Sequence, residues 1–174
     1  KTAYEIRLSL VGSEMCIRDR QYLVVKYNDV LNLLQDKVPA LMTLFEYIHS
    51  VDSYEKLLKV SNVSCEEQKF PLIMLQVKFS DDPNKGGFDP KVLIEKWDQI
   101  KQLKSIKIKG LMTINPKGLS STENIKLFKE CRNLADYLNL HDCSMGMSGD
   151  WEDAVEAGST WLRLGSIIFG NRSY

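Results

Sequence analysis

From residue 45 onward the sequence alternates between short apolar runs and amphipathic stretches of helical length. One run, Pro71–Phe79, is apolar enough for burial on both faces of a sheet. The stretches between runs carry helix-start signals, such as Asp89 before Pro90 and Ser120 three residues before Glu123. The expected strands are Phe45–Val51, Pro71–Phe79, Ile106–Ile114, His141–Met147 and Thr160–Leu164. Strands that alternate with helices predict an α/β fold with a parallel sheet, which right-handed crossovers close into a barrel.

The stretch from Cys143 to Gly170 has the layout of an anion site. It reads as a strand, a polar turn, a short helix, a second strand and a Gly-Ser step into a last helical turn. A helix that begins just after Gly165-Ser166 would point its unpaired N–H donors at a bound phosphate. Arg163 adds a positive charge two residues before the glycine. The small residues that let the backbone approach a phosphate are Ser144, Gly146, Ser148, Gly165 and Ser166.

The same residues also have simpler interpretations. Ser148 can cap the acidic helix that starts near Asp150, and Gly165-Ser166 can be an ordinary turn. Arg163 can form a salt bridge with a carboxylate such as Glu152 or Asp153. The sequence pattern by itself leaves these alternatives open.

These residues carry a resemblance to a known family. The stretch resembles the C-terminal signature of the pyridoxal 5′-phosphate (PLP) homeostasis proteins, the YggS/PROSC family, whose fold is similar to the barrel domain of alanine racemase. Further upstream matches extend the resemblance over roughly Leu44 to Tyr174. The matching segments are 144–150, 154–160, 163–172, 48–53, 84–88 and 110–116.

The resemblance implies a (β/α)8 TIM barrel of the alanine racemase N-terminal type that binds PLP and manages its supply without turning over a substrate. It implies that Ser148, Gly165 and Ser166 hold the cofactor phosphate and that Arg163 faces the pyridine nitrogen. The further site candidates are Ser144, Met147 and Met112. It implies no catalytic residue, and PLP-dependent apoenzymes are the expected recipients. The alternatives are a PLP-dependent amino-acid racemase or decarboxylase, and a phosphate-binding barrel lacking PLP.

A whole barrel typically needs about 250 residues, and this chain has 174. We therefore expect an incomplete barrel with about strands four to eight, in which residues 21–174 are the C-terminal part of one domain. Residues 1–20 contain a segment, Ser9–Arg20, that resembles a translated sequencing adapter, and we interpret them as non-native. The lysine through which family members attach the cofactor is not recognisable in the sequence.

The composition argues against several classes of ligand and partner. The charges balance at 23 basic and 23 acidic residues, without a dense basic stripe, which argues against nucleic acid as the main ligand. We find no apolar run long enough to span a bilayer and no secretory signal pattern, so we expect a cytoplasmic protein without a membrane partner. Four scattered cysteines and two histidines predict no metal site. We interpret His49 as a structural histidine.

Overall fold

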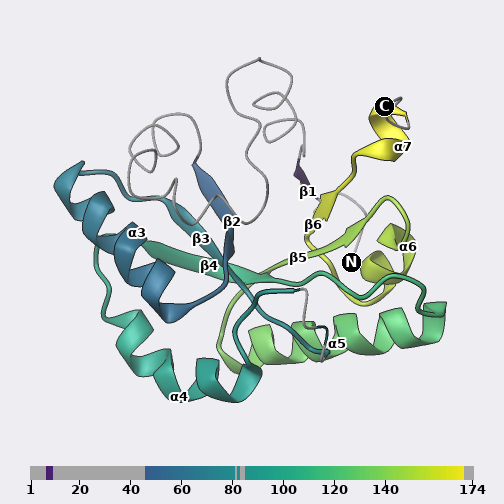
Figure 1. Cartoon of the computed structure of the whole chain (residues 1–174), viewed down its shortest axis with the longest axis horizontal. Coiled ribbons are helices and arrows are strands. Elements are labelled where there is room, and N and C mark those ends of the chain that lie inside the picture. The colour runs from purple at the N-terminus through teal and green to yellow at the C-terminus, as the bar shows by residue number, and fades with distance from the viewer. Residues whose placement is uncertain (1–6, 10–45, 81, 83–84, 171–174) are drawn as a thin grey trace.

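The computed structural model describes residues 7–9, 46–80, 82 and 85–170. Within these ranges strands and helices alternate as the sequence predicts (Figure 1). The strands are β1 (Arg7–Ser9), β2 (Tyr47–Val51), β3 (Leu72–Gln76), β4 (Lys107–Met112), β5 (Asp142–Met147) and β6 (Trp161–Arg163). The helices are α3 (Tyr54–Glu66), α4 (Pro90–Lys101), α5 (Ser121–Tyr137), α6 (Trp151–Glu156) and α7 (Ser166–Phe169).

The six described strands belong to one parallel sheet with the order β1-β6-β5-β4-β3-β2. The five expected strands therefore pair in chain order, which confirms the predicted parallel sheet. The sheet is also strongly curled. Although three strands separate β2 from β6 in the sheet, the ring centroids of Tyr47 and Trp161 are only 4.7 Å apart. This contact across the concave side identifies the sheet as part of a barrel wall.

The short strand β1 was not predicted. It pairs in parallel with β6, with Arg7 opposite Trp161 and Ser9 opposite Arg163. Among the described residues β1 and β2 form the two edges of the sheet. The interpretation of residues 1–20 as non-native stays a prediction, because residues 10–20 lie outside the described part of the chain.

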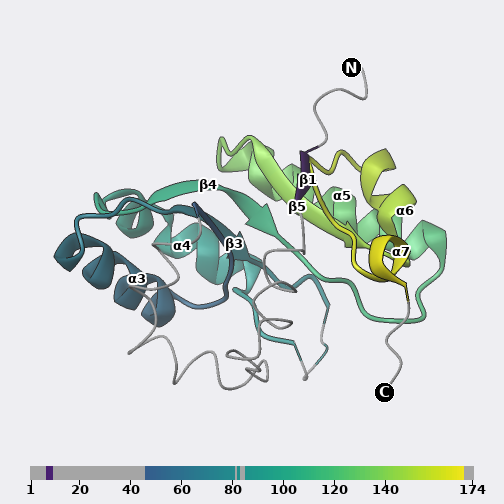
Figure 2. The same cartoon turned by 90° about the horizontal axis from the view of Figure 1, so that it is seen from above.

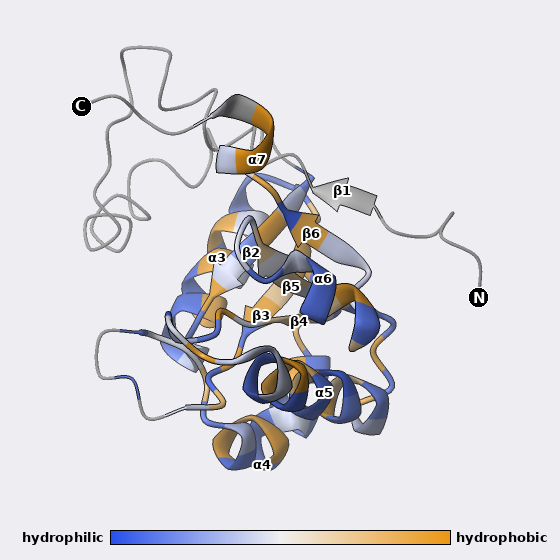
Figure 3. Ribbon diagram, turned by 90° about the vertical axis from the view of Figure 1, so that its right-hand side faces the viewer, coloured by the Kyte–Doolittle hydropathy of each residue, from blue (hydrophilic) through white to orange (hydrophobic). Residues whose placement is uncertain are grey.

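Helices cover the outer side of the curled sheet, where α3, α4, α5 and α6 surround the strands (Figure 1). The hydropathy colouring shows apolar and polar faces on α4 and α5 (Figure 3). Strand residues that point to the helices, such as Leu75, Leu111 and Leu162, are buried with Phe128 of α5 in one apolar core. Residues that alternate with them, such as Ser144 and Arg163, point to the barrel interior, because successive strand side chains face opposite sides.

Local capping signals explain where three of the helices begin. The side chains of Ser53 and Asp89 accept backbone N–H bonds at the starts of α3 and α4. Ser120 and Glu123 form the predicted capping box of α5. Helix α3 begins at Tyr54 and extends to Glu66. None of the described helices combines the length and apolarity that a bilayer crossing requires.

Candidate cofactor site

The carboxyl ends of β5 and β6 bring two loops together at one end of the molecule. Figures 1 and 2 show α6 and α7, which follow these strands, at the same end of the molecule. The Ser148 hydroxyl oxygen accepts hydrogen bonds from the backbone N–H groups of Gly165, at 3.2 Å, and Ile167, at 3.3 Å. Two backbone donors from the segment after β6 and one hydroxyl from the loop after β5 therefore converge on one point. In parallel barrels this carboxyl-end face is where ligands bind.

The structure decides between two roles for Ser148. The N-cap of α6 is Asp150, whose Oδ1 accepts the N–H of Met147 at 2.6 Å. Ser148 is therefore not the cap of the acidic helix, and its hydroxyl instead bonds the amides at the start of α7. Helix α7 begins at Ser166 after Gly165, as the sequence predicts. Ser166 is exposed at the first position of this helix.

Arg163 is the last residue of β6, and its guanidinium reaches back to the middle of β5 and to the carboxyl end of β4. One terminal nitrogen donates to the backbone oxygen and to the hydroxyl of Ser144, both at 2.8 Å. The other donates to the backbone oxygen of Thr113 at 2.9 Å. These three bonds fix the plane of the guanidinium. They direct the charge into the barrel mouth and away from the helical shell.

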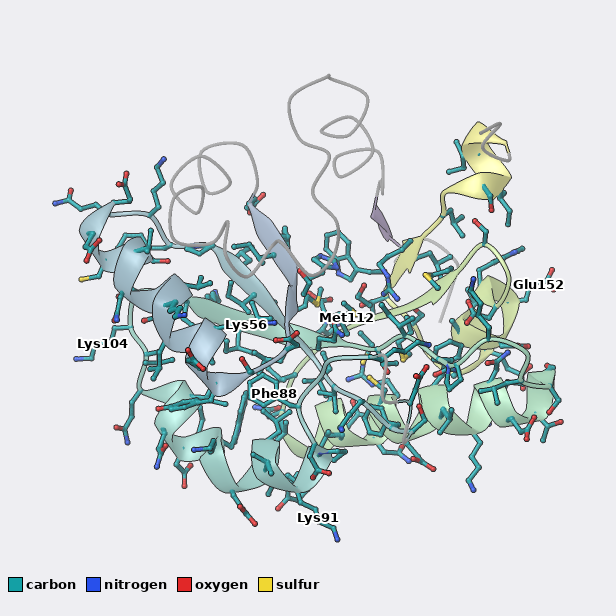
Figure 4. The ribbon with its side chains drawn as sticks, viewed as in Figure 1. Lys56, Phe88, Lys91, Lys104, Met112 and Glu152 are labelled. Carbon is teal, nitrogen blue, oxygen red and sulfur yellow. The ribbon has the colours of Figure 1, made fainter. Side chains whose placement is uncertain are left out.

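The carboxylates considered as partners of Arg163 lie on α6. Asp153 accepts hydrogen bonds from Ser121 at 2.5 Å and from Asn124 at 3.0 Å, both in α5. Glu152 is exposed and lies at the periphery of the molecule (Figure 4). The positions of these two carboxylates therefore favour the interpretation in which the guanidinium of Arg163 acts inside the barrel and does not form a salt bridge with α6.

The remaining predicted residues differ in burial. Ser144 is fully buried on the inner face of β5, where it contacts Arg163. Met112 is buried at the end of β4, outside the apolar core cluster, and lies in the middle of the molecule (Figure 4). Met147 ends β5 with 36% of its surface exposed. Met147 pairs with Arg163 in the sheet register, so both residues sit at the same level of the barrel.

His49 is a neighbour of this site that the sequence did not place there. Its Nδ1 lies 3.0 Å from the Ser144 hydroxyl oxygen. Burial, and then the positive charge of Arg163, lower the pKa of His49 to about 4, although Asp142 acts in the opposite direction. No local signal could have shown this contact, since 95 residues separate His49 from Ser144.

Comparisons with known proteins give the family. The family model "Alanine racemase, N-terminal domain" matches residues 27–173. The pyridoxal phosphate homeostasis protein of Synechocystis sp. is 40% identical over 157 residues, which cover 87% of this chain and 72% of that protein. The chain belongs to the pyridoxal phosphate homeostasis protein family. The match confirms the resemblance seen in the sequence.

Similar solved structures, two of them of a COG0325 family member, agree with that assignment. PipY of Synechococcus elongatus PCC7942 without PLP has a TM-score of 0.74 and 37% identity, covering 84% of this chain and 67% of PipY. PipY with PLP bound has a TM-score of 0.73 and 32% identity, covering 92% and 76%. Alanine racemase of Clostridium difficile 630, at 14% identity and a TM-score of 0.65, covers 80% of this chain and 40% of the racemase and shows the fold alone.

The residues at the barrel mouth suit a phosphorylated pyridine. Two amide donors aimed at one oxygen, that of Ser148, are the arrangement that a phosphate oxygen can enter. Arg163 stands two residues before Gly165, and its side chain extends into the barrel to Ser144 and Thr113. A cationic donor and the amides at the start of α7 are therefore both present at this part of the barrel, which suits a ligand with a ring nitrogen and a phosphate.

Proposed function

We propose that this protein binds PLP at the carboxyl ends of β5 and β6 and takes part in PLP homeostasis without turning over a substrate. The observation that carries the proposal is the likeness to PipY, whose structure has been solved with PLP bound. The family name of the Synechocystis relative supports the homeostasis role. In this proposal the protein acts in the cytoplasm and passes PLP to PLP-dependent apoenzymes.

The proposed binding roles follow from the contacts at the barrel mouth. Ser148, Gly165 and Ser166 hold the phosphate, with the amides at the start of α7 as donors. Arg163, held by Ser144 and Thr113, donates to the pyridine nitrogen. An arginine at that position keeps the ring nitrogen unprotonated, which makes the cofactor a poor electron sink. Met112 and Met147 line the ring.

The lowered pKa of His49 and its contact with Ser144 support the proposal that PLP is bound without turnover of a substrate. A general base works best when its pKa lies near the operating pH. The pKa of His49 is about 4 and its Nδ1 is occupied by the Ser144 hydroxyl. At neutral pH this group is a weak base. Tyr47 is also on the concave side, but it is the first residue of β2, at the end of the strand opposite the mouth.

Retention of PLP after dialysis tests the proposal. The purified chain is incubated with PLP, dialysed and scanned for the visible absorbance of the cofactor. We expect the wild-type chain to retain PLP and the double variant Arg163→Ala, Ser148→Ala to lose it, because each contact to a charged group is worth ~1.5–3 kcal/mol. Equal absorbance in both proteins would show that the site lies elsewhere.

One control and two further measurements sharpen this test. Ser120→Ala is the matched control, since it removes the same hydroxyl from a helix start that lies outside the site. Borohydride treatment followed by mass spectrometry tells whether PLP is attached to a lysine or held by non-covalent contacts. Mixing the loaded chain with a PLP-dependent apoenzyme and following its recovery of activity then tests the delivery role.

A further inference from the structure

Three side chains from three strands form one hydrogen-bonded chain inside the barrel. His49 comes from β2, Ser144 from β5 and Arg163 from β6. Nδ1 of His49 lies 3.0 Å from the Ser144 hydroxyl oxygen, and that oxygen accepts from Arg163 at 2.8 Å. This series of hydrogen bonds crosses the concave side of the sheet, because β2 and β6 are not adjacent strands.

The positions of the protons follow from the chemistry of the three groups. A guanidinium can only donate, so its bond to Ser144 uses a lone pair of the hydroxyl oxygen. Ser144 is fully buried, and a buried hydroxyl needs an acceptor for its own hydrogen. Within the described part of the chain, the acceptor in contact with this hydroxyl is Nδ1 of His49. His49 must therefore carry its hydrogen on Nε2.

The surroundings of His49 hold its ring in place. Trp161 packs edge-on against it, with centroids 5.3 Å apart and an angle of 80° between the rings. Tyr47 packs against it with a centroid distance of 6.0 Å and an angle of 67°. The charged groups that act on His49 are Arg163 and Asp142, from β6 and β5. A protonated ring would turn Nδ1 into a donor and place a second positive charge beside Arg163.

We infer that His49 is a positioning residue, which holds Arg163 through Ser144 in the orientation that makes the site select an unprotonated pyridine nitrogen. This inference rests on the proposed function, since it assigns a selective role to the same site. If Ser144 lost its acceptor, its hydrogen would compete for the backbone oxygens that hold the guanidinium, and Arg163 would gain alternative orientations. The phosphate contacts at α7 would be unaffected, because they come from other residues.

The test compares PLP with its 1-deaza analogue, in which a C–H group replaces the ring nitrogen. Both compounds present the same phosphate, but the analogue cannot accept a hydrogen bond from Arg163. We expect the wild-type chain to bind PLP about tenfold more tightly than the analogue, as one such hydrogen bond allows. We expect His49→Leu to bring this ratio close to one and to leave the affinity for inorganic phosphate unchanged.

Three variants make the result specific. His49→Asn should restore most of the ratio, because an amide oxygen can accept from Ser144 at about the position of Nδ1. Ser144→Ala should bring the ratio of the two affinities close to one although the histidine is still present. This variant keeps the inference testable if His49→Leu does not fold. His141→Leu is the matched control, since the His141 side chain is 84% exposed and outside the site; it should keep the wild-type ratio.

Nitrogen NMR gives a readout that does not depend on ligand binding. With His141 replaced, one imidazole remains, and we expect its shifts to show hydrogen on Nε2 at pH 7. A hydrogen on Nδ1 would overturn the inference. So would a wild-type ratio retained in both His49→Leu and Ser144→Ala. If the wild-type chain binds neither compound, the proposed function falls together with the inference.

Discussion

The face of the sheet that meets the helices and the face that lines the barrel interior bury different chemistry. Toward the helices, Leu75, Leu111 and Leu162 need only apolar neighbours. Toward the interior, His49, Ser144 and Arg163 are held by hydrogen bonds across three strands. The first kind of burial tolerates any well-packed hydrophobic neighbour, whereas the second depends on which atom carries each hydrogen. Stability and ligand recognition are therefore separated onto opposite faces of one sheet.

The largest expected effect comes from the helix-facing side. Phe128 of α5 is fully buried in the apolar core. Phe128→Ala should lower the free energy of unfolding by about 3–5 kcal/mol, through lost transfer energy and a residual cavity. Urea unfolding measures this loss. Because the interior face is intact in the folded fraction, PLP affinity per folded chain should not change, and a selective loss of PLP affinity would contradict the separation of the two faces.

The second effect belongs to the interior face and depends on pH. The pKa of His49 is lowered from 6.5 to about 4 by burial and by Arg163, against Asp142. Between these values the unfolded histidine binds a proton that the folded one does not. The free energy of unfolding should therefore fall by roughly 3 kcal/mol on this account as the pH drops from 6.5 to 4, and no further below.

The variant His49→Asn isolates this contribution from the carboxylates that titrate nearby. Between pH 6.5 and pH 4, the free energy of unfolding of the variant should fall less than that of the wild-type chain, by roughly the same amount. The lowered pKa of Glu123, caused by its hydrogen bonds to Ser120, adds an acid-side loss that both proteins share. Identical curves for the two proteins would show that His49 is not held neutral.

The smallest effect compares two serines at helix starts. Ser120→Ala and Ser148→Ala should each lower the free energy of unfolding by about 1 kcal/mol or less, because each removes a hydroxyl that accepts backbone N–H bonds at the start of a helix. Only Ser148→Ala should also weaken PLP binding, because Ser148 stands among the amides at α7. Isothermal titration with PLP separates the two variants. Equal affinities would place the phosphate away from Ser148.

Sequence patterns predicted the strands and helices well because the signals are local. The apolar run before Gln76 and the capping box at Ser120 lie where β3 and α5 form. The alternation of facing side chains also places Ser144 and Arg163 on one face, once β5 and β6 are known to be strands. The family and its fold were recognisable for the same reason, since the matching motifs are contiguous stretches.

The contacts between distant strands could not be predicted in this way. The bond between His49 and Ser144 depends on the curl of the sheet, which no run of residues encodes by itself. The strand β1 gave no usable signal because three residues are too few for a periodic pattern. The roles of Ser148, Arg163, Gly165, Ser166, Ser144, Met147 and Met112 toward PLP stay predictions until a ligand is bound.

A crystal structure of the chain grown with PLP tests the central claim most directly. We expect the phosphate within hydrogen-bonding distance of the Ser148 hydroxyl and the backbone N–H groups at Gly165 and Ser166. We expect the pyridine nitrogen to face Arg163, with the Arg163 to Ser144 bond preserved. A phosphate bound away from α7, or a ring nitrogen turned away from Arg163, would contradict the account.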